Sequence, residues 1–373
     1  MKVVIISGTM FPHISARSFR TTELAKGLAQ MGHDVTIYTI LGTYDYSEMQ
    51  SAFPNLHIKT LGKTIFGNPN SDGFVKKNVL QRALTHFLYN VIDYPRCEYF
   101  FKTINALKAE SEFDYLITIA HPYGIHWGAA YYKKQNLNNL KFKYWVSDCG
   151  DPFMGDPDVK RWNLFLRPIE RFWGKMTDQI VIPVENGRSA YYDEVQDKIS
   201  IIPQSVDFRS FILANYKQNP VPTFGYSGAI YPNMRDPRHF LEYLTTVDYD
   251  FKFIAYVPSD AVFKDYTESL GSKLEVRRYV PRIDLVREMS SMDFLININN
   301  NSIVQTPSKL IDYSITQRPI LNISTDFSNQ DRLNFNAFLR KDYSSQFRVD
   351  NIEQYDTKNV CAKFINLYEN GTK

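Results

Sequence analysis

The sequence predicts an α/β protein built from two Rossmann-like, doubly wound domains, and three observations carry this prediction. Short apolar runs typical of buried strands alternate with stretches of helical periodicity along the 373 residues. A polar stretch containing two prolines, residues 204–222, separates two such series. The length fits two domains, and 44% hydrophobic residues are enough for packed cores.

The first series begins with a strand, a helix and a second strand. Residues 3–7 form a continuous apolar run, residues 18–30 have helical periodicity, and Gly32 follows as a stop signal before the apolar residues 34–40. This order is a βαβ unit, which implies parallel strands. The further strands that we expect lie at 56–61, 115–120, 142–147, 179–183 and 198–203. The further helices lie at 79–108 (broken at Pro95), 123–134, 162–176 and around 188–195, and residues 41–75 are otherwise expected to be loops.

The second series repeats the same alternation after the polar stretch. Its expected strands lie at 223–227, 251–257, 274–279, 294–297 and 320–323. Its expected helices lie at 237–244, 259–270, 283–291 and 308–316. In open α/β sheets, ligands bind outside the carboxyl ends of the strands, so the candidate functional residues are sought there.

Composition excludes several classes of protein. Lys and Arg number 43 and Asp and Glu number 40, which is too balanced for a chain that coats nucleic acid. The three scattered cysteines form no disulfide framework and no paired zinc-ligand spacing, and they fit a reducing, cytoplasmic compartment. No apolar run approaches the ~18 residues of a membrane span. The apolar run at the N-terminus is short for a signal peptide and is interpreted as a strand.

Positive charge is concentrated in the first half. Residues 1–175 contain 21 Lys or Arg and 15 Asp or Glu, a balance of +6. This indicates either an anionic partner, such as the phospholipid of an inner membrane face, or an ordinary solvated surface.

The segment from residue 297 to residue 323 has the pattern of an anion site. An Asn-rich strand end leads into Pro307, Ser308 and Lys309 at the start of a helix, with Asp312 one turn further. Helix-start N–H groups beside a hydroxyl and an amine suit a phosphate, and a carboxylate nearby suits the hydroxyls of a ribose. The alternative is a capped helix on which Lys309 and Asp312 are an exposed i,i+3 pair.

A family resemblance follows from this segment. The run SKLIDYSITQRPIL, residues 308–321, closely resembles the SKLxEYxAxGKPIL stretch of GT-B glycosyltransferases of family 4, which are retaining and use nucleotide sugars. Further segments resemble that family in its order and spacing, including GHDVTIYT at the second strand. These segments lie at residues 7–39, 113–124, 143–153, 197–208, 224–244 and 276–296.

The resemblance implies a domain division and an activity. It implies an acceptor-binding domain over residues 1–205, a nucleotide-sugar-binding domain over 206–350 that faces it across a cleft, and a C-terminal helix in 351–373 that packs back on the first domain. The implied reaction transfers a glycosyl group to a hydroxyl of a glycan or lipid-linked acceptor in surface polysaccharide synthesis, without a metal or another cofactor.

The resemblance also assigns roles to single residues. Asp312 stands where the family has the second Glu of its Glu-x7-Glu element, which holds the donor's ribose. Gly228 and Arg235 match the family's diphosphate-binding strand end and basic residue, and Ser308 and Lys309 are further donor candidates. Gly8, the only glycine of the first loop, where the family often has a pair, is a further donor-binding candidate.

Two residues at strand ends of the first domain are the catalytic candidates. His121 is expected to touch the donor sugar or the acceptor hydroxyl, and the alternative is a His that merely caps a strand. Asp148, with Asp151 nearby, is expected to bind an acceptor hydroxyl or to act as a base if the reaction inverts. The alternative reading of both is a turn around Gly150.

The sequence departs from the family at the first Glu, which falls at Val304, where Gln305 or Asn300 are the possible substitutes. The sequence Asp156-Pro157-Asp158 spells the Asp-x-Asp of metal-dependent enzymes but stands in a proline-rich turn, so we expect no metal there. Two other functions stay open: a UDP-sugar 2-epimerase of the same fold, and a catalytically inactive GT-B subunit.

Overall fold

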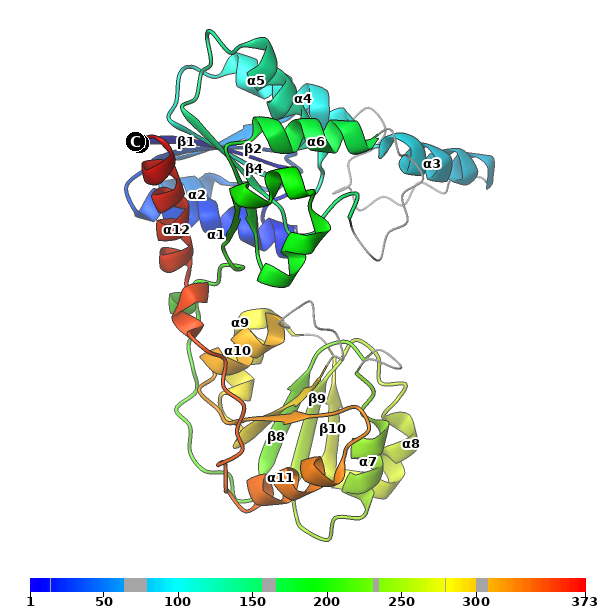
Figure 1. Cartoon of the computed structure of the whole chain (residues 1–373). Coiled ribbons are helices and arrows are strands. Elements are labelled where there is room, and N and C mark those ends of the chain that lie inside the picture. Colours follow the sequence, from blue (N-terminus) through cyan, green and yellow to red (C-terminus); the bar gives the residue numbers. More distant parts are fainter. Residues whose placement is uncertain (14, 64–78, 156–165, 231–234, 279, 300–307) are drawn as a thin grey trace. The chain divides into compact units, whose positions relative to one another are not determined.

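The computed structural model in Figure 1 describes residues 1–13, 15–63, 79–155, 166–230, 235–278, 280–299 and 308–373. The chain divides into two compact units: Met1–Val206 with Gln354–Lys373, and Asp207–Glu353. The domain boundaries expected from the sequence, between residues 205 and 206 and between residues 350 and 351, lie within a few residues of these divisions. Each unit has a parallel sheet covered by helices, so the predicted two-domain, Rossmann-like α/β class is confirmed.

The first unit is built on a sheet that has seven strands among the described residues, in the order β3-β2-β1-β4-β5-β6-β7, all parallel. The strands are β1 (Lys2–Ser7), β2 (Asp34–Thr39), β3 (Leu56–Thr60), β4 (Tyr115–Ile119), β5 (Tyr144–Asp148), β6 (Gln179–Ile182) and β7 (Ile199–Ile201). Alternate residues of one strand face opposite layers, so that Val4 and Ile6 belong to one apolar core and Val3 and Ile5 to the other.

Helices cover both faces of this sheet, as Figure 1 shows. They are α1 (Ala16–Gln30), α2 (Ser47–Ala52), α4 (Glu98–Ala109), α5 (Gly124–Gln135), α6 (Leu166–Met176) and α12 (Thr357–Gly371). Helix α3 (Val79–Ile92) projects beyond the sheet (Figure 1). The C-terminal α12 lies along α1, where Gly27 permits the close approach. A Cβ on Gly27 would stand 2.5 Å from the Sγ of Cys361. Burial of Phe364 and Cys361 in the core attaches α12 to this unit.

The second unit repeats the architecture with five described parallel strands in the order β10-β9-β8-β11-β12. They are β8 (Thr223–Ser227), β9 (Lys252–Tyr256), β10 (Leu274–Arg277), β11 (Phe294–Ile298) and β12 (Ile320–Ile323). The helices are α7 (Arg238–Thr245), α8 (Lys264–Leu270), α9 (Arg282–Met289), α10 (Ser308–Ile315) and α11 (Asn329–Leu339). An aromatic core around Phe224 lies on the side of α7 and α11, and a smaller core around Tyr313 lies on the side of α9 and α10.

The strand orders place the candidate sites. In each sheet the chain order reverses beside the first strand, between β1 and β4 and between β8 and β11. Loops leaving two such strands diverge to opposite faces of the sheet and leave a crevice between them. Gly8 and His121 follow β1 and β4, and Gly228 follows β8, so these three residues lie at the switch points.

Some local expectations need correction. The helix expected around 188–195 is instead two 3-10 helices, Glu185–Ala190 and Asp193–Lys198, that Tyr191 and Tyr192 separate. Helices α2 and α11 were not expected, and the part of the helix expected at 162–165 lies outside the described residues. Within the described part of the chain, every helix is too short or too polar to cross a bilayer.

Candidate functional site

The start of α10 is fixed against the carboxyl end of β8. Tyr313 of α10 is buried, and its hydroxyl accepts a hydrogen bond of 2.7 Å from the Ser227 N–H. Gly228 directly follows the strand with a φ of +132°, a conformation that side-chain-bearing residues rarely adopt. A Cβ at Gly228 would lie 3.8 Å from the Cδ of Lys309. The strand end and the first turn of α10 therefore form one surface.

Lys309 is the most unusual side chain on this surface. It is 9% exposed, and its Nζ has no hydrogen-bond partner among the residues that the structure describes. The amine lies 4.5 Å from the centre of the Tyr226 ring, a cation–π distance. A buried ammonium group without an acceptor is costly, and such groups in native proteins are normally paired.

Arg235 adds a second positive charge near the Lys309 amine. Burial, and to a smaller extent the positive charge of Arg235, lowers the pKa of the Lys309 amine from 10.5 to about 7. Two basic side chains and the start of α10, whose N–H groups have no preceding helical turn, thus adjoin one strand end. A phosphate-type anion is the group that this arrangement lacks.

Asp312 lies one turn further along α10 and has a partner that the sequence did not reveal. Arg282, the first residue of α9, donates from Nε at 2.9 Å and from Nη2 to the same oxygen, Oδ1. Burial raises the pKa of the Asp312 carboxyl, and the charge of Arg282 opposes this shift. Oδ2 of Asp312 takes no part in the hydrogen bonds with Arg282. The predicted ribose contact therefore has an acceptor atom whose orientation Arg282 fixes.

For Ser308, the first residue of α10, the structure describes the backbone but not the side chain. Val304, with its possible substitutes Asn300 and Gln305, lies outside the described residues, and so does the sequence Asp156-Pro157-Asp158.

In the first unit, Gly8 and His121 lie against each other at the switch point. A Cβ on Gly8 would stand 2.5 Å from the Cδ of Pro122 and 3.3 Å from the carbonyl oxygen of His121. Gly8 is therefore required by packing, because any larger residue would push the two strand ends apart. The half-buried imidazole of His121 lies edge-on to the Tyr123 ring, with the ring centres 5.1 Å apart.

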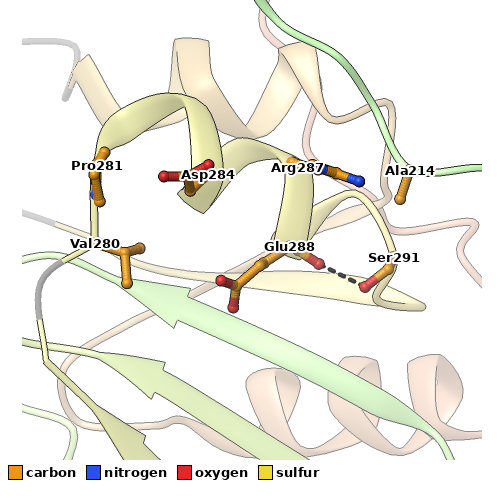
Figure 2. Close-up of a pocket in the computed structure, with 7 residues that line it drawn as sticks. All are labelled: Ala214, Val280, Pro281, Asp284, Arg287, Glu288 and Ser291. Atoms are coloured by element: carbon orange, nitrogen blue, oxygen red, sulfur yellow. Dashed lines mark hydrogen bonds between the residues drawn. The ribbon is translucent and has the colours of Figure 1, made fainter.

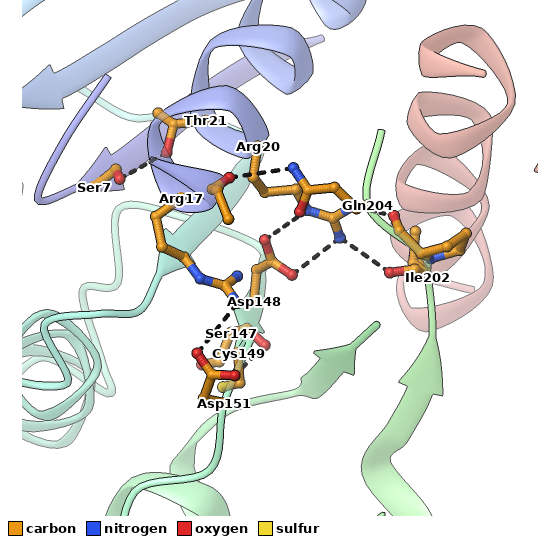
Figure 3. A network of polar contacts seen from close by, with 12 residues as sticks. Ser7, Arg17, Arg20, Thr21, Ser147, Asp148, Cys149, Asp151, Ile202 and Gln204 are labelled. Carbon is orange, nitrogen blue, oxygen red and sulfur yellow. Dashed lines mark hydrogen bonds and ion pairs between the residues drawn. The ribbon is translucent and has the colours of Figure 1, made fainter. Parts of the chain in front are cut away.

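Asp148 occupies a different environment from the one its predicted catalytic role requires. It is the last residue of β5 and is 1% exposed. Figure 3 shows its carboxylate facing the guanidinium of Arg20. Buried Arg20 of α1 donates to both of its oxygens, at 2.9 Å and 3.0 Å, and also to the carbonyls of Ile202 and Pro203. Both carboxylate oxygens are engaged and shielded from solvent. We therefore correct the catalytic assignment of Asp148 to a structural ion pair between α1, β5 and the end of β7.

Asp151 keeps a looser ion contact beside this pair. Its Oδ2 lies 3.9 Å from Nη2 of Arg17, whose guanidinium rests directly over Gly150. A Cβ at Gly150 would coincide with that guanidinium, at 0.6 Å from Nη2. The glycine that the sequence suggested as a turn residue therefore also makes room for Arg17.

The described surface also has a hollow that none of the predicted residues lines. It has a volume of about 400 Å³, runs along α9, and is shown in Figure 2. Its lining residues are Ala214, Val280, Pro281, Asp284, Arg287, Glu288 and Ser291. Glu288, its half-buried carboxylate, already accepts hydrogen bonds from Arg277 and Tyr256. Because its charges are mixed in sign and Glu288 is satisfied, we place the candidate site at Lys309 instead.

Metal ligands are not gathered anywhere in the described residues. No group of three or more His, Cys, Asp or Glu side chains there has an arrangement that could hold a metal ion.

Comparison with known proteins identifies the fold. No protein-family model and no curated protein sequence matches the chain. Among solved structures, the lipopolysaccharide outer core galactosyltransferase WaaB aligns over 99% of both chains with a TM-score of 0.61 and 11% identity. Anabaena HepE, solved with UDP and glucose, aligns over 99% of this chain and 100% of its own, with a TM-score of 0.58 and 7% identity.

A protein described as a different enzyme has a similar fold, with a somewhat lower TM-score. A putative UDP-N-acetylglucosamine 2-epimerase from Listeria monocytogenes aligns over 98% of this chain and 94% of its own, with a TM-score of 0.54 and 11% identity. At these identities the likeness concerns the fold. The chain therefore has the two-domain GT-B fold of these enzymes over its full length.

Proposed function

We propose that the protein is a glycosyltransferase that moves a sugar from a nucleoside diphospho-sugar to an acceptor hydroxyl. The observation that carries this proposal is the buried amine of Lys309 beside Arg235, which has no hydrogen-bond partner among the described residues. It lies at the start of α10 and the carboxyl end of β8. A diphosphate bound there would supply the missing anion. The GT-B fold, shared with WaaB and with HepE in its UDP complex, supports the same reading.

The proposed chemistry breaks the bond between the sugar's anomeric carbon and the diphosphate oxygen and forms a bond to the acceptor oxygen. Negative charge grows on the diphosphate oxygen as it leaves, and that oxygen takes up the proton of the acceptor hydroxyl. Lys309, Arg235 and the amides at the start of α10 would stabilise the leaving group as preorganised charges and dipoles. We assign the ribose hydroxyls to Asp312, as positioned by Arg282.

His121 is assigned to the transfer step at the first unit's switch point. His121→Ala is then expected to lower kcat and to leave nucleotide affinity unchanged, which marks an interaction made in the transition state. A large loss of nucleotide affinity in His121→Ala would instead place the imidazole in the nucleotide site.

The acceptor and the compartment are further parts of the proposal. We propose a glycan or lipid-linked acceptor of a surface polysaccharide pathway, by analogy with the lipopolysaccharide named for WaaB. The three free cysteines, two of them buried, support a reducing cytoplasmic location. The positive balance of residues 1–175 supports contact with an anionic inner membrane face.

The competing function is a UDP-sugar 2-epimerase, because one similar fold carries that description. The second unit contains a single histidine, His239, which is exposed and lies 3.3 Å from Glu242 of the same helix. We therefore favour transfer, since the histidine that this unit offers is exposed and lies beside Glu242.

Two measurements test the proposal together. Thermal shifts with UDP, GDP, dTDP, ADP and CMP identify the base, since a ligand that binds the native state raises the melting temperature. The sugar nucleotides of the preferred base are then incubated with the protein, with and without glycan acceptors. Acceptor-dependent release of the nucleotide supports a transferase, and an epimerised sugar nucleotide without acceptor supports the epimerase. Binding without either product indicates an inactive GT-B subunit.

A further inference from the structure

Two arginines stand one turn apart on α1, and among the described residues only one of them has hydrogen-bond acceptors. Arg20 is buried and donates to both carboxylate oxygens of Asp148, at 2.9 Å and 3.0 Å. Arg17 is 19% exposed, and its one described partner is an oxygen of Asp151 at 3.9 Å, on a side chain that is 52% exposed. A long, half-exposed ion pair contributes little, so the five N–H donors of Arg17 are available to a ligand.

The guanidinium of Arg17 lies at the carboxyl edge of the first sheet. It rests over the backbone of Gly150, two residues beyond the end of β5, where a Cβ would stand 0.6 Å from Nη2. Figure 3 shows the side chain reaching from α1 to Asp151. Because ligands of open α/β sheets bind outside the carboxyl ends of the strands, this donor group stands where a ligand is expected.

His121 is a second basic side chain at this edge. Burial lowers the pKa of His126 to about 3, and positive charges on His121 and Arg17 contribute to that shift. The two basic groups therefore act on one buried ring. The nitrogens of that ring already contact Thr118 Oγ1, at 2.8 Å, and Cys149 Sγ, at 3.4 Å. A ligand at this edge would therefore meet His121 and Arg17 and not the buried histidine.

We propose that Arg17 binds an oxyanion carried by the acceptor, either a phosphate or a carboxylate, beside His121. The proposal rests on the proposed function, in which Lys309 and Arg235 of the second unit bind the diphosphate of the donor. A planar guanidinium donates two parallel hydrogen bonds to either oxyanion, so it selects charged acceptors over neutral ones. Asp151 competes with that oxyanion for Arg17.

The first test counts anion sites by equilibrium dialysis of the full-length protein against inorganic pyrophosphate. The unmodified protein should bind two pyrophosphates, and Arg17→Gln and Lys309→Met should each lose one of them. Arg171→Gln is the matched control, because Arg171 is an arginine on α6 of the same unit, 3.2 Å from Glu194, and this variant should bind two. Pyrophosphate binding by Arg17→Gln equal to that of the unmodified protein would overturn the inference. Unchanged binding by Lys309→Met would instead contradict the proposed function.

Two further variants separate ligand binding from a structural role. Arg17→Lys keeps the charge but not the planar fork, so it should retain weakened pyrophosphate binding. Asp151→Asn removes the competing carboxylate and should tighten binding by up to about fivefold, the scale of one exposed ion pair. Weaker binding by Asp151→Asn would show that Arg17 needs this carboxylate as its partner, which would overturn the inference. So would loss of the nucleotide-induced thermal shift in Arg17→Gln at an unchanged melting temperature, because Arg17 would then belong to the nucleotide site.

Competition identifies the oxyanion. Lys309→Met, in which the first unit should hold the remaining pyrophosphate, is titrated with glucose 1-phosphate, with glucuronate and with neutral methyl glucoside. Displacement by glucose 1-phosphate indicates a phosphate-bearing acceptor, and displacement by glucuronate indicates a uronic acid. No displacement by either anion, or equal displacement by methyl glucoside, would overturn the inference. In turnover with the acceptor class so identified, Arg17→Gln should raise the acceptor KM about tenfold and leave kcat nearly unchanged.

Discussion

The nucleotide site that we propose at Lys309 should make nucleotide binding depend on pH. In the unliganded protein its amine has a pKa of about 7. A bound diphosphate stabilises the ammonium form, so the pKa of Lys309 must be higher in the complex. Between the two pKa values, binding takes up a proton, so affinity falls by up to about tenfold per pH unit as the pH rises above 7.

Calorimetry in buffers of different ionisation heat measures the number of protons taken up on binding. The titrations are made above pH 7.5, where the terminal phosphate of the nucleotide is already ionised. The described groups that act on the amine are Arg235, through its charge, and Tyr226, whose ring lies beneath it. Lys309→Arg is the control, since a guanidinium stays charged and the affinity should lose its pH dependence. Proton uptake that persists in Lys309→Arg would mean that another group titrates.

Burial of the Lys309 amine should also lower the stability of the unliganded protein. Its pKa is about 7 in the folded protein and about 10.5 in the unfolded chain. Between pH 7 and pH 10.5 the unfolded chain therefore binds more protons than the folded protein, so the stability rises with pH in this range. The loss of stability caused by Lys309 is complete below pH 7 and disappears above pH 10.5. Lys309→Met keeps most of the apolar stem and removes the charge, so we expect a higher melting temperature near pH 7. A lower melting temperature would show that the amine stabilises the fold.

Asp312 and Arg282 should act together on the ribose. Asp312→Asn keeps the shape and weakens the acceptor, so it should reduce affinity for UDP more than for 2′-deoxy-UDP, if the contact is to the 2′-hydroxyl. Arg282→Gln should show the same selectivity because it releases Asp312 from its fixed position. Calorimetry with the two nucleotides tests this. Equal losses for both nucleotides would remove the 2′-hydroxyl from this contact.

At the scale of elements, the Arg20–Asp148 pair joins α1 to the end of β5. Asp148→Asn leaves a buried guanidinium without its counter-charge, so it should reduce the free energy of unfolding by about 3–5 kcal/mol. The double variant Arg20→Met with Asp148→Asn removes the orphaned charge and should recover part of that loss. Urea denaturation measures both. Unchanged stability of Asp148→Asn together with lost turnover would restore the catalytic assignment.

Elements with strong local signals were predictable from sequence. The buried strands are continuous apolar runs, and β1, β4, β8 and β12 were located to within a residue or two because parallel strands are apolar on both faces. Helix α11 was missed although Ser328 and Asp331 form a capping box at its start. Helix α2 has no buried residue, so it lacks the periodicity that reveals a helix.

The candidate site was only partly predictable, for a physical reason. Lys309 and Gly228 stand in local patterns, a helix start and a strand end, which a sequence displays. The partner of Asp148 is 128 residues away in the chain, and the partner of Asp312 is 30 residues away. Such pairings depend on tertiary packing, so no local pattern distinguished a buried ion pair from a catalytic carboxylate.

At the scale of the whole molecule, one chain supplies two sheets of the same topology. Each sheet reverses its strand order beside its first strand, and that point carries Gly8 with His121 in one unit and Gly228 in the other. The C-terminal α12 returns to the first unit, so the second unit is an insertion between the two ends of the first. In the function that we propose, the nucleotide binds at the switch point of the second unit and the acceptor at that of the first.

The most direct test of the central claim is calorimetric titration of the preferred nucleoside diphosphate into the unmodified protein, Lys309→Met and Lys264→Met. Lys264 is the matched control because it is an exposed lysine on α8 of the same unit. We expect Lys309→Met to lose about tenfold or more in affinity, the scale of one charge-assisted hydrogen bond, and Lys264→Met to bind like the unmodified protein. Equal affinity of all three proteins would contradict a diphosphate site at Lys309.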